Sequence, residues 1–229
     1  MQWIFHYQLF LFDLDGLLVD TEKLHYQAYI DMCAQRGCQL SWSFHRYSEA
    51  AHHESTGLRD QIYAEFPELQ AQEPDWQVLY EEKKQRFLNL IEKGAVPLMP
   101  GVKELLLALN RANIKRCVVT HSASVLIDKI RRQNPILDTI PHWITREDYT
   151  HPKPHPECYQ AAINRLRETK DRIIGFEDSP RGLYALLETE AKPVLICPPD
   201  SPYLKNILTL HANVRFYPSF SAITDPESP

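Results

Sequence analysis

The sequence lacks any apolar run long enough to cross a membrane. Its most apolar N-terminal stretch, residues 3–12, has no basic flank and is interrupted by His6 and Gln8. A bilayer-spanning helix needs about 20 apolar residues, and a signal peptide needs a charged start before its apolar segment. We therefore expect neither, and we expect this stretch to lead into a strand.

Basic clusters, paired cysteine motifs, internal repeats and low-complexity segments are also missing. The net charge is −5, and no block of Lys and Arg occurs, which argues against nucleic-acid and membrane partners. None of the five cysteines forms a CxxC pair, and Cys117 and Cys197 lie in apolar segments, where a free thiol packs as a small hydrophobe. We predict a reduced, cytoplasmic protein.

What the sequence does have is a pair of carboxylates directly after an apolar strand. Residues 9–12 read Leu-Phe-Leu-Phe, and Asp13 and Asp15 follow. Side chains two apart on an extended backbone face the same side, and Gly16 allows a sharp turn after them. Two close anions need a cation or a shared proton, so the pair suits a carboxylate nucleophile beside a general acid. Alone, it also fits an ordinary polar turn.

Further polar groups follow other predicted strands. Thr120 ends a predicted strand at 114–120, and Glu177 and Asp178 end an apolar one at 173–178. Lys153 lies between two prolines before a predicted helix. Because open α/β sheets bind ligands at the carboxyl ends of their strands, we expect these groups to converge.

The order of predicted elements indicates an α/β fold. Strand patterns near 7–13, 115–120, 142–145, 173–177 and 193–197 alternate with helical patterns, which predicts a Rossmann-like parallel sheet. Residues 21–97 contain only helical patterns, and Pro97 and Pro100-Gly101 mark the return to the sheet. We predict a core of residues 1–20 and 98–229 with an inserted all-helical cap at 21–97.

In this order and spacing, the motifs resemble those of the haloacid dehalogenase superfamily. The similarity is greatest to its β-phosphoglucomutase and phosphoglycolate phosphatase branch. The matching segments are residues 10–22, 118–122, 153–159 and 175–182.

The resemblance implies a role for each residue. Asp13 would be the nucleophile that forms an aspartyl-phosphate, and Asp15 the general acid and base. Thr120, together with the amides at the start of the next helix, would bind phosphate, and Lys153 would bridge Asp13 and the phosphate. Mg²⁺ would be held by Asp13, the main-chain oxygen of Asp15, Glu177 and Asp178. Contacts to substrate are predicted from Gly16, His25, Arg59, His121 and Ser122.

The resemblance leaves a phosphomutase as an alternative to a phosphatase. A mutase of this branch grips a second phosphate with a glycine and basic residues of a cap loop, whereas residues 47–55 here contain no Gly, Lys or Arg. Arg59 is the first basic residue after that stretch. We therefore predict a Mg²⁺-dependent phosphatase for a small phosphorylated metabolite, acting as a monomer or weak dimer. The alternatives are a sugar phosphomutase and a catalytically idle binding module.

Overall fold

The computed structural model describes residues 1–53 and 57–227. The chain divides into two compact units, Met1–Asp20 with Val96–Pro229, and Thr21–Ala95. Val96 and Pro97 belong to the first unit, because the Val96 amide donates to Gln133 Oε1 (2.9 Å) and Pro97 accepts from the Asp20 amide (2.9 Å). The sequence prediction placed these two residues in the insertion.

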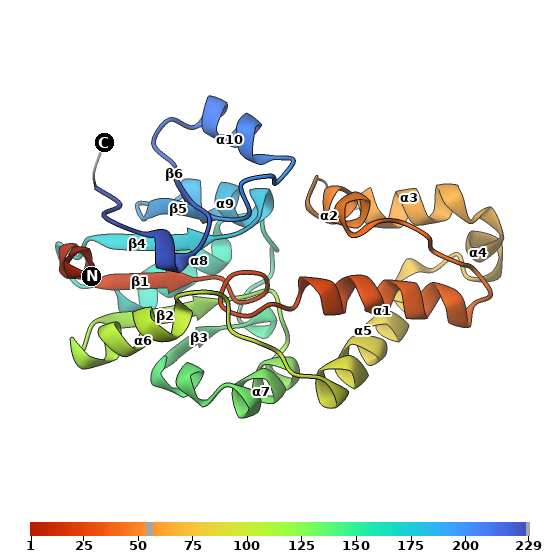
Figure 1. Ribbon diagram of the computed structural model, residues 1–229, viewed down its shortest axis with the longest axis horizontal. Helices are drawn as coiled ribbons and strands as arrows, with labels where there is room; N and C mark the ends of the chain where they lie inside the picture. Colours follow the sequence, from red (N-terminus) through yellow and green to blue (C-terminus); the bar gives the residue numbers. More distant parts are fainter. Residues whose placement is uncertain (54–56, 228–229) are drawn as a thin grey trace. The chain divides into compact units, whose positions relative to one another are not determined.

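The first unit is built on a six-stranded sheet in the order β3-β2-β1-β4-β5-β6 (Figure 1). Every neighbouring pair is parallel, so the predicted α/β fold class is confirmed. The order reverses where β1 lies between β2 and β4, which is the switch point of such sheets. The strands are β1 (Leu9–Phe12), β2 (Lys115–Val119), β3 (His142–Ile144), β4 (Ile173–Glu177), β5 (Lys192–Ile196) and β6 (Arg215–Tyr217).

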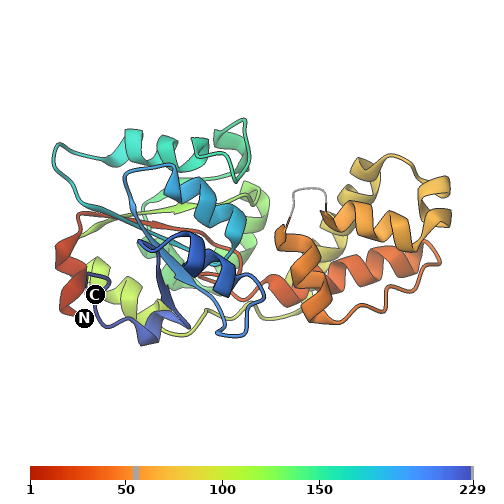
Figure 2. The same ribbon diagram turned by 90° about the horizontal axis from the view of Figure 1, so that it is seen from above.

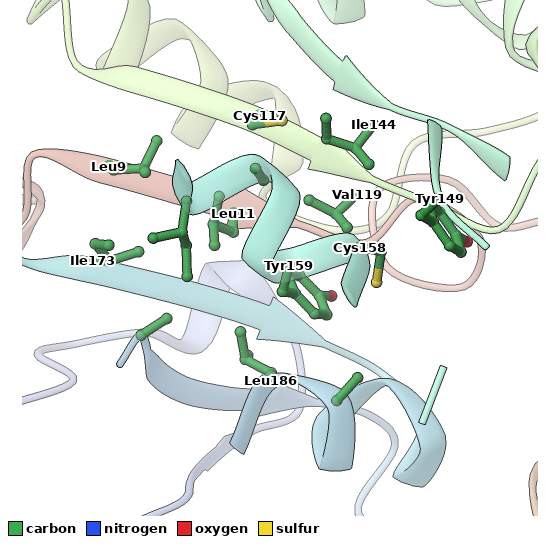
Figure 3. Packing of buried hydrophobic residues seen from close by; sticks show 14 residues of the cluster. Leu9, Leu11, Cys117, Val119, Ile144, Tyr149, Cys158, Tyr159, Ile173 and Leu186 are labelled. Atoms are coloured by element: carbon green, nitrogen blue, oxygen red, sulfur yellow. The ribbon is translucent and has the colours of Figure 1, made fainter. Parts of the chain in front are cut away.

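Alternation along β1 explains why the strand is apolar throughout. Leu9 and Leu11 face a cluster with Cys158 and Tyr159 of α8 (Glu157–Leu166), as Figure 3 shows. Phe10 and Phe12 point to the opposite face, where both rings stack with Phe176. Both faces are covered, so every residue of β1 is fully buried.

Helices lie on both faces of this sheet (Figure 2). α8 contacts β1, β2 and β3, and α9 (Pro180–Leu187) contacts β4 and β5. The opposite face carries α6 (Val102–Arg111), which packs on the short helix η4 (Phe220–Ala222). The remaining helices of this unit are η1 (Gln2–His6), α7 (Ser124–Gln133), η2 (Pro135–Thr139), η3 (Arg146–Asp148) and α10 (Leu204–Leu210).

The second unit contains only helices among its described residues. α1 (Glu22–Gln35) packs along α5 (Trp76–Lys93), and α2 (Phe44–His53), α3 (Gly57–Glu65) and α4 (Pro67–Gln72) complete it. Its core combines aliphatic side chains with the aromatic residues Tyr29, Trp42, Tyr47 and Tyr63. Across both units, none of the described helices is long and apolar enough to cross a membrane.

Candidate active site

Asp13 and Asp15 leave the sheet where β1 ends. The Asp13 amide donates to the Phe176 carbonyl of β4 (3.1 Å), which ties the first residue after the strand to its neighbour. Gly16 then takes a left-handed conformation with a φ of 78°, and its amide donates to the Val19 carbonyl (2.9 Å). The turn therefore holds both aspartates at the switch point of the sheet.

Lys153 is buried and joins the acids from two strands. Its ammonium donates to Asp13 Oδ1 and to Glu177 Oε1, both at 2.6 Å, and to the Val119 carbonyl at 3.0 Å. A buried ammonium is tolerated only when it is paired and hydrogen-bonded. The predicted contact with Asp13 is present, and Glu177 is a second partner that the sequence did not indicate.

Tyr159 completes this network and was not among the residues predicted for the site. Its hydroxyl donates to Glu177 Oε1 and accepts from Lys153 Nζ (3.3 Å). Burial, together with the Glu177 carboxylate, holds the Tyr159 pKa well above its usual value, so the phenol remains a donor. The available signal was a tyrosine on the sheet-facing side of a predicted helix, where a buried hydroxyl needs a partner.

The charges of this network are unbalanced. Burial raises the pKa of Asp13 to about 8, with Lys153 opposing the rise and Glu177 and Asp15 adding to it. Burial acts to lower the pKa of Lys153, but Asp13 and Glu177 outweigh it and hold that pKa well above its usual value. The lysine therefore stays protonated, and further positive charge is needed to keep the acids ionised together.

Glu177 and Asp178 follow β4, and Glu177 fits against Gly182 of α9. A Cβ at position 182 would lie 2.0 Å from Glu177 Oε2, so a larger residue there would displace the carboxylate. Ser179 caps α9 by accepting from the Gly182 amide (3.2 Å), and Pro180 is the first helical residue, as the sequence predicts. This N-terminal helix cap thus fixes the backbone next to Glu177 and Asp178.

Asp15 faces two hydroxyls from the loop after β2. Ser122 Oγ donates to Asp15 Oδ2 at 2.6 Å, and Thr120 Oγ1 donates to the same oxygen at 3.4 Å. Thr120 Oγ1 also accepts from the Ser122 amide (3.0 Å). Thr120 and Ser122 therefore position the carboxylate of Asp15, and the structure brings all three residues together.

The expected anion site at the start of α7 already holds a carboxylate. Glu147 accepts from the Ser124 amide (3.3 Å) and from Ser124 Oγ (3.1 Å). An acid of the chain itself therefore complements that helix end, and a phosphate contact from the amides after Thr120 remains a prediction. The Ser122 amide likewise has Thr120 as its acceptor.

His121 is held by Tyr149. The Tyr149 hydroxyl donates its proton to the Thr120 carbonyl (3.1 Å) and lies 2.9 Å from His121 Nδ1. A phenol has one proton, so Nδ1 must donate and Nε2 is left as an acceptor. Burial of the ring, with Arg146, Arg181 and Lys153 nearby, lowers the pKa of His121 to about 4. His121 is therefore neutral at pH 7.

His25 contacts two residues of its own unit. Its ring stacks on Phe87 of α5 at a centroid distance of 3.8 Å, and its Nδ1 lies 2.6 Å from Lys83 Nζ. Lys83 is buried among the rings of Tyr29, Tyr80 and Phe87. A substrate contact from His25 remains a prediction.

Arg59 and Arg46 are the basic residues on either side of the stretch 47–55. Arg59 Nε donates to Asp60 Oδ1 (2.7 Å), and Arg46 donates to Glu65 Oε2 (2.6 Å). Residues 47–53 belong to α2, whereas 54 and 55 lie outside the described residues. Both arginines therefore have acidic partners, and a substrate contact from Arg59 remains a prediction.

Asp13, Glu177 and Asp178 could hold a metal ion. They offer carboxylate oxygens that all lie within 4.8 Å of one another. An oxygen-only set suits a hard divalent cation, and such a cation would supply the positive charge that the buried acids need. The residues therefore fit the ion that the sequence predicts, whereas the main-chain oxygen of Asp15 remains a predicted ligand.

Comparison with known proteins gives one family for most of the chain. A family described as haloacid dehalogenase-like hydrolase matches residues 7–188. Protein CbbY of Cereibacter sphaeroides is 29% identical over 181 residues, covering 76% of this chain and 77% of that protein. Hexitol phosphatase B of Escherichia coli (strain K12) is 26% identical over 196 residues, covering 83% and 84%.

Solved structures show the same fold. The β-phosphoglucomutase of Clostridium difficile superposes with a TM-score of 0.72 at 21% identity, covering 95% of this chain and 93% of the other. At that identity the likeness supports the architecture of a parallel sheet with an inserted helical unit.

Proposed function

Because the chain belongs to the haloacid dehalogenase-like hydrolase family, we propose that it hydrolyses phosphate monoesters of small metabolites through an aspartyl-phosphate. One observation carries the proposal. Buried Asp13 is hydrogen-bonded to Lys153 (2.6 Å) and shares a metal-capable cluster with Glu177 and Asp178 at the switch point of the sheet.

Asp13 is the proposed nucleophile. One carboxylate oxygen attacks phosphorus, the phosphorus–oxygen bond of the ester breaks, and an acyl phosphate forms on Asp13. Lys153 lies 2.6 Å from Asp13 Oδ1, where its charge reduces repulsion between the carboxylate and an incoming phosphate dianion. Once Lys153 and the proposed metal ion together keep it ionised, the Asp13 carboxylate needs no general base.

Asp15 is the proposed acid and base. It gives a proton to the departing alkoxide and later takes one from the water that attacks the aspartyl-phosphate. Its carboxylate oxygen accepts from Ser122 and Thr120, which hold it in a fixed orientation. Ser122 and Thr120 thereby act as positioning residues for Asp15.

Mg²⁺ is the proposed cofactor, held by Asp13, Asp178, the main-chain oxygen of Asp15, and Glu177 directly or through water. When bound, it would neutralise and orient the oxygens of the transferring phosphoryl group. Glu177 also accepts from Lys153 and Tyr159, so it links the metal cluster to the lysine.

The proposed substrates are small phosphorylated sugars and polyols, in keeping with the named activity of the hexitol phosphatase relative. The helical unit would act as a cap that excludes water during transfer. We also propose a cytoplasmic location, which the five free, buried cysteines support, and a monomer or weak dimer.

The decisive experiment combines metal dependence with mapping of the phosphorylated residue. Turnover of an aryl phosphate should require Mg²⁺, stop with excess chelator, and be inhibited by Ca²⁺, whose larger and looser coordination alters the in-line geometry. Mass spectrometry of rapidly quenched enzyme should place the phosphoryl group on Asp13. A phosphoryl group on another residue, or full activity in chelator, would contradict the proposal.

A panel of sugar, polyol and glycolate phosphates then separates hydrolase from mutase. We expect inorganic phosphate release, no activation by hexose bisphosphates and no interconversion of sugar-phosphate isomers, because Arg46 and Arg59 are already paired with acids. Interconversion faster than phosphate release would identify a mutase. Binding without turnover across the whole panel would indicate a catalytically idle binding module.

A further inference from the structure

A second cluster of metal-ligand side chains lies in the loop that carries Lys153. His151, His155 and Glu157 come from the segment His-Pro-Lys-Pro-His-Pro-Glu at the start of α8. Each offers one ligand atom, and these atoms all lie within 4.8 Å of one another. The cluster has no part in the proposed phosphoryl transfer.

Glu157 anchors the cluster to the backbone. Its Oε1 accepts from the Thr150 amide and its Oε2 from the His151 amide, both at 2.9 Å. These two bonds, with a further one from the His151 ring, lower the pKa of Glu157 to about 2. The carboxylate is thus ionised at neutral pH and is held in place before any ion arrives.

The two imidazoles converge on this carboxylate. His151 Nδ1 lies 2.5 Å from Glu157 Oε2, whereas His155 Nδ1 accepts from the Glu157 amide (3.2 Å) and lies 4.0 Å from the same oxygen. The rings lie beside each other, with centroids 4.7 Å apart. Both side chains are more than half exposed, at 64% and 52%, so they can rotate by the small amount that a metal–nitrogen bond of about 2.0–2.1 Å requires.

We propose that His151, His155 and Glu157 form a second metal site, which takes a borderline divalent cation such as Zn²⁺. Two imidazoles and one carboxylate suit Zn²⁺, Ni²⁺ or Cu²⁺, whereas Mg²⁺ prefers oxygen ligands only. The cation replaces the proton between His151 and Glu157, and water completes the coordination shell. The hydrogen bonds from two backbone amides orient the carboxylate as outer-shell partners do in other metal sites.

A cation bound at this site would constrain the loop that carries Lys153. Its histidine ligands flank the sequence Pro152-Lys153-Pro154, and Lys153 Nζ is fixed at the other end by Asp13 and Glu177. A cation that joins His151 to His155 therefore closes a short loop around the residue that bridges the acids. Binding to the folded state should raise its thermal stability by mass action.

The test uses the full chain without a polyhistidine tag, in excess Mg²⁺. Cu²⁺ bound at one equivalent should give an electron paramagnetic resonance spectrum with superhyperfine coupling to imidazole nitrogen, which an all-carboxylate site cannot produce. Calorimetry with Zn²⁺ should give one site. His151→Gln and His155→Gln should each weaken Zn²⁺ by at least about 10-fold, and the double variant should lose the nitrogen coupling and the thermal shift.

His6→Gln is the matched control. His6 is an exposed histidine 3.9 Å from Asp225, and it lies outside the cluster of His151, His155 and Glu157, so its loss should leave Zn²⁺ affinity unchanged. Equal Zn²⁺ affinity in the wild type and the double variant, or nitrogen coupling that survives in the double variant, would overturn the proposal. Neither readout depends on hydrolysis, so the result stands apart from the test of the proposed function.

Discussion

Among the described residues of the first unit, two clusters offer ligand atoms for a cation, and they are built in opposite ways. The cluster of Asp13, Glu177 and Asp178 offers only oxygen atoms, and Asp13 and Glu177 are buried. The cluster of His151, His155 and Glu157 adds nitrogen, and both of its histidines are exposed. One loop joins them, because it carries Lys153 into the first cluster and both histidines of the second.

The difference shows what burial requires. In the buried cluster, charge must be compensated within the fold, and Lys153 and Tyr159 do so with hydrogen bonds to Glu177. In the exposed cluster, water can solvate every group, and backbone amides suffice to orient Glu157 and His155. We therefore expect the buried cluster to govern activity and stability, and the exposed one to affect neither strongly until it binds a metal.

The largest effect on activity is expected when the proposed nucleophile, Asp13, is replaced. Asp13→Asn should lower kcat for an aryl phosphate by about 10⁴-fold or more and abolish the phosphoryl-enzyme, because an amide oxygen is a poor nucleophile. His151→Gln, measured in parallel without transition metals, should stay within about two-fold of wild type. Equal losses in the two variants would refute the division of roles between the clusters.

Removing Lys153 should affect activity and stability together. Lys153→Met leaves Asp13 and Glu177 buried without their cationic partner, which should lower the free energy of unfolding by about 3–5 kcal/mol. Urea denaturation without divalent cations measures this loss, and added Mg²⁺ should recover part of it. The control is Lys103→Met on the exposed side of α6, which should change stability by less than about 0.5 kcal/mol.

Adding one methyl group behind Glu177 tests how closely the buried cluster is packed. In Gly182→Ala the new Cβ would overlap Glu177 Oε2, 2.0 Å away, and would force the carboxylate off Lys153 and Tyr159. We expect a loss of about 1–3 kcal/mol in stability and of about 10²-fold in kcat.

Gly175→Ala supplies the matched control for that change. Its Cβ would meet the apolar side chain of Leu186 at 2.5 Å, away from the carboxylates. Stability should fall as in Gly182→Ala, while kcat stays near that of wild type. A similar fall of kcat in both variants would mean that general packing, rather than the placement of Glu177, sets activity.

The sequence predicted the buried cluster better than its surroundings. Asp13 and Glu177 were identified because each ends or follows an apolar run, which is a local pattern, and Lys153 because it lies between two prolines in a segment that resembles a motif of the family. Tyr159 was missed because its role depends on α8 packing over the end of β1, which is a tertiary contact. Glu147 was missed for the same reason, since it reaches the start of α7 from a separate turn.

The edges of the fold were also harder to predict than its centre. β6 and α10 were not expected, because Arg215–Tyr217 is a three-residue edge strand and Leu204–Leu210 is a short helix. Neither is long enough to show a clear period. The strand β1, by contrast, is buried on both faces, and its sequence shows this directly.

The smallest effect on stability is expected from the titration of His121, whose side chain is less buried than Asp13 and Glu177. The residue is exposed overall, yet its ring faces Tyr149, and its pKa is lowered from 6.5 to about 4. The unfolded chain therefore takes up a proton at higher pH than the native state does. The stability that wild type gains from neutral His121 should be present above pH 6.5 and fall as the pH drops toward 4.

His121→Gln removes this titration and should flatten that part of the stability curve. Because the side chain is partly solvated, the change should be below about 1 kcal/mol. Parallel thermal unfolding of both proteins from neutral to acidic pH measures it. If wild type and His121→Gln lose stability in parallel across this range, then the native pKa of His121 is not lowered from 6.5, and the fold does not hold its ring neutral.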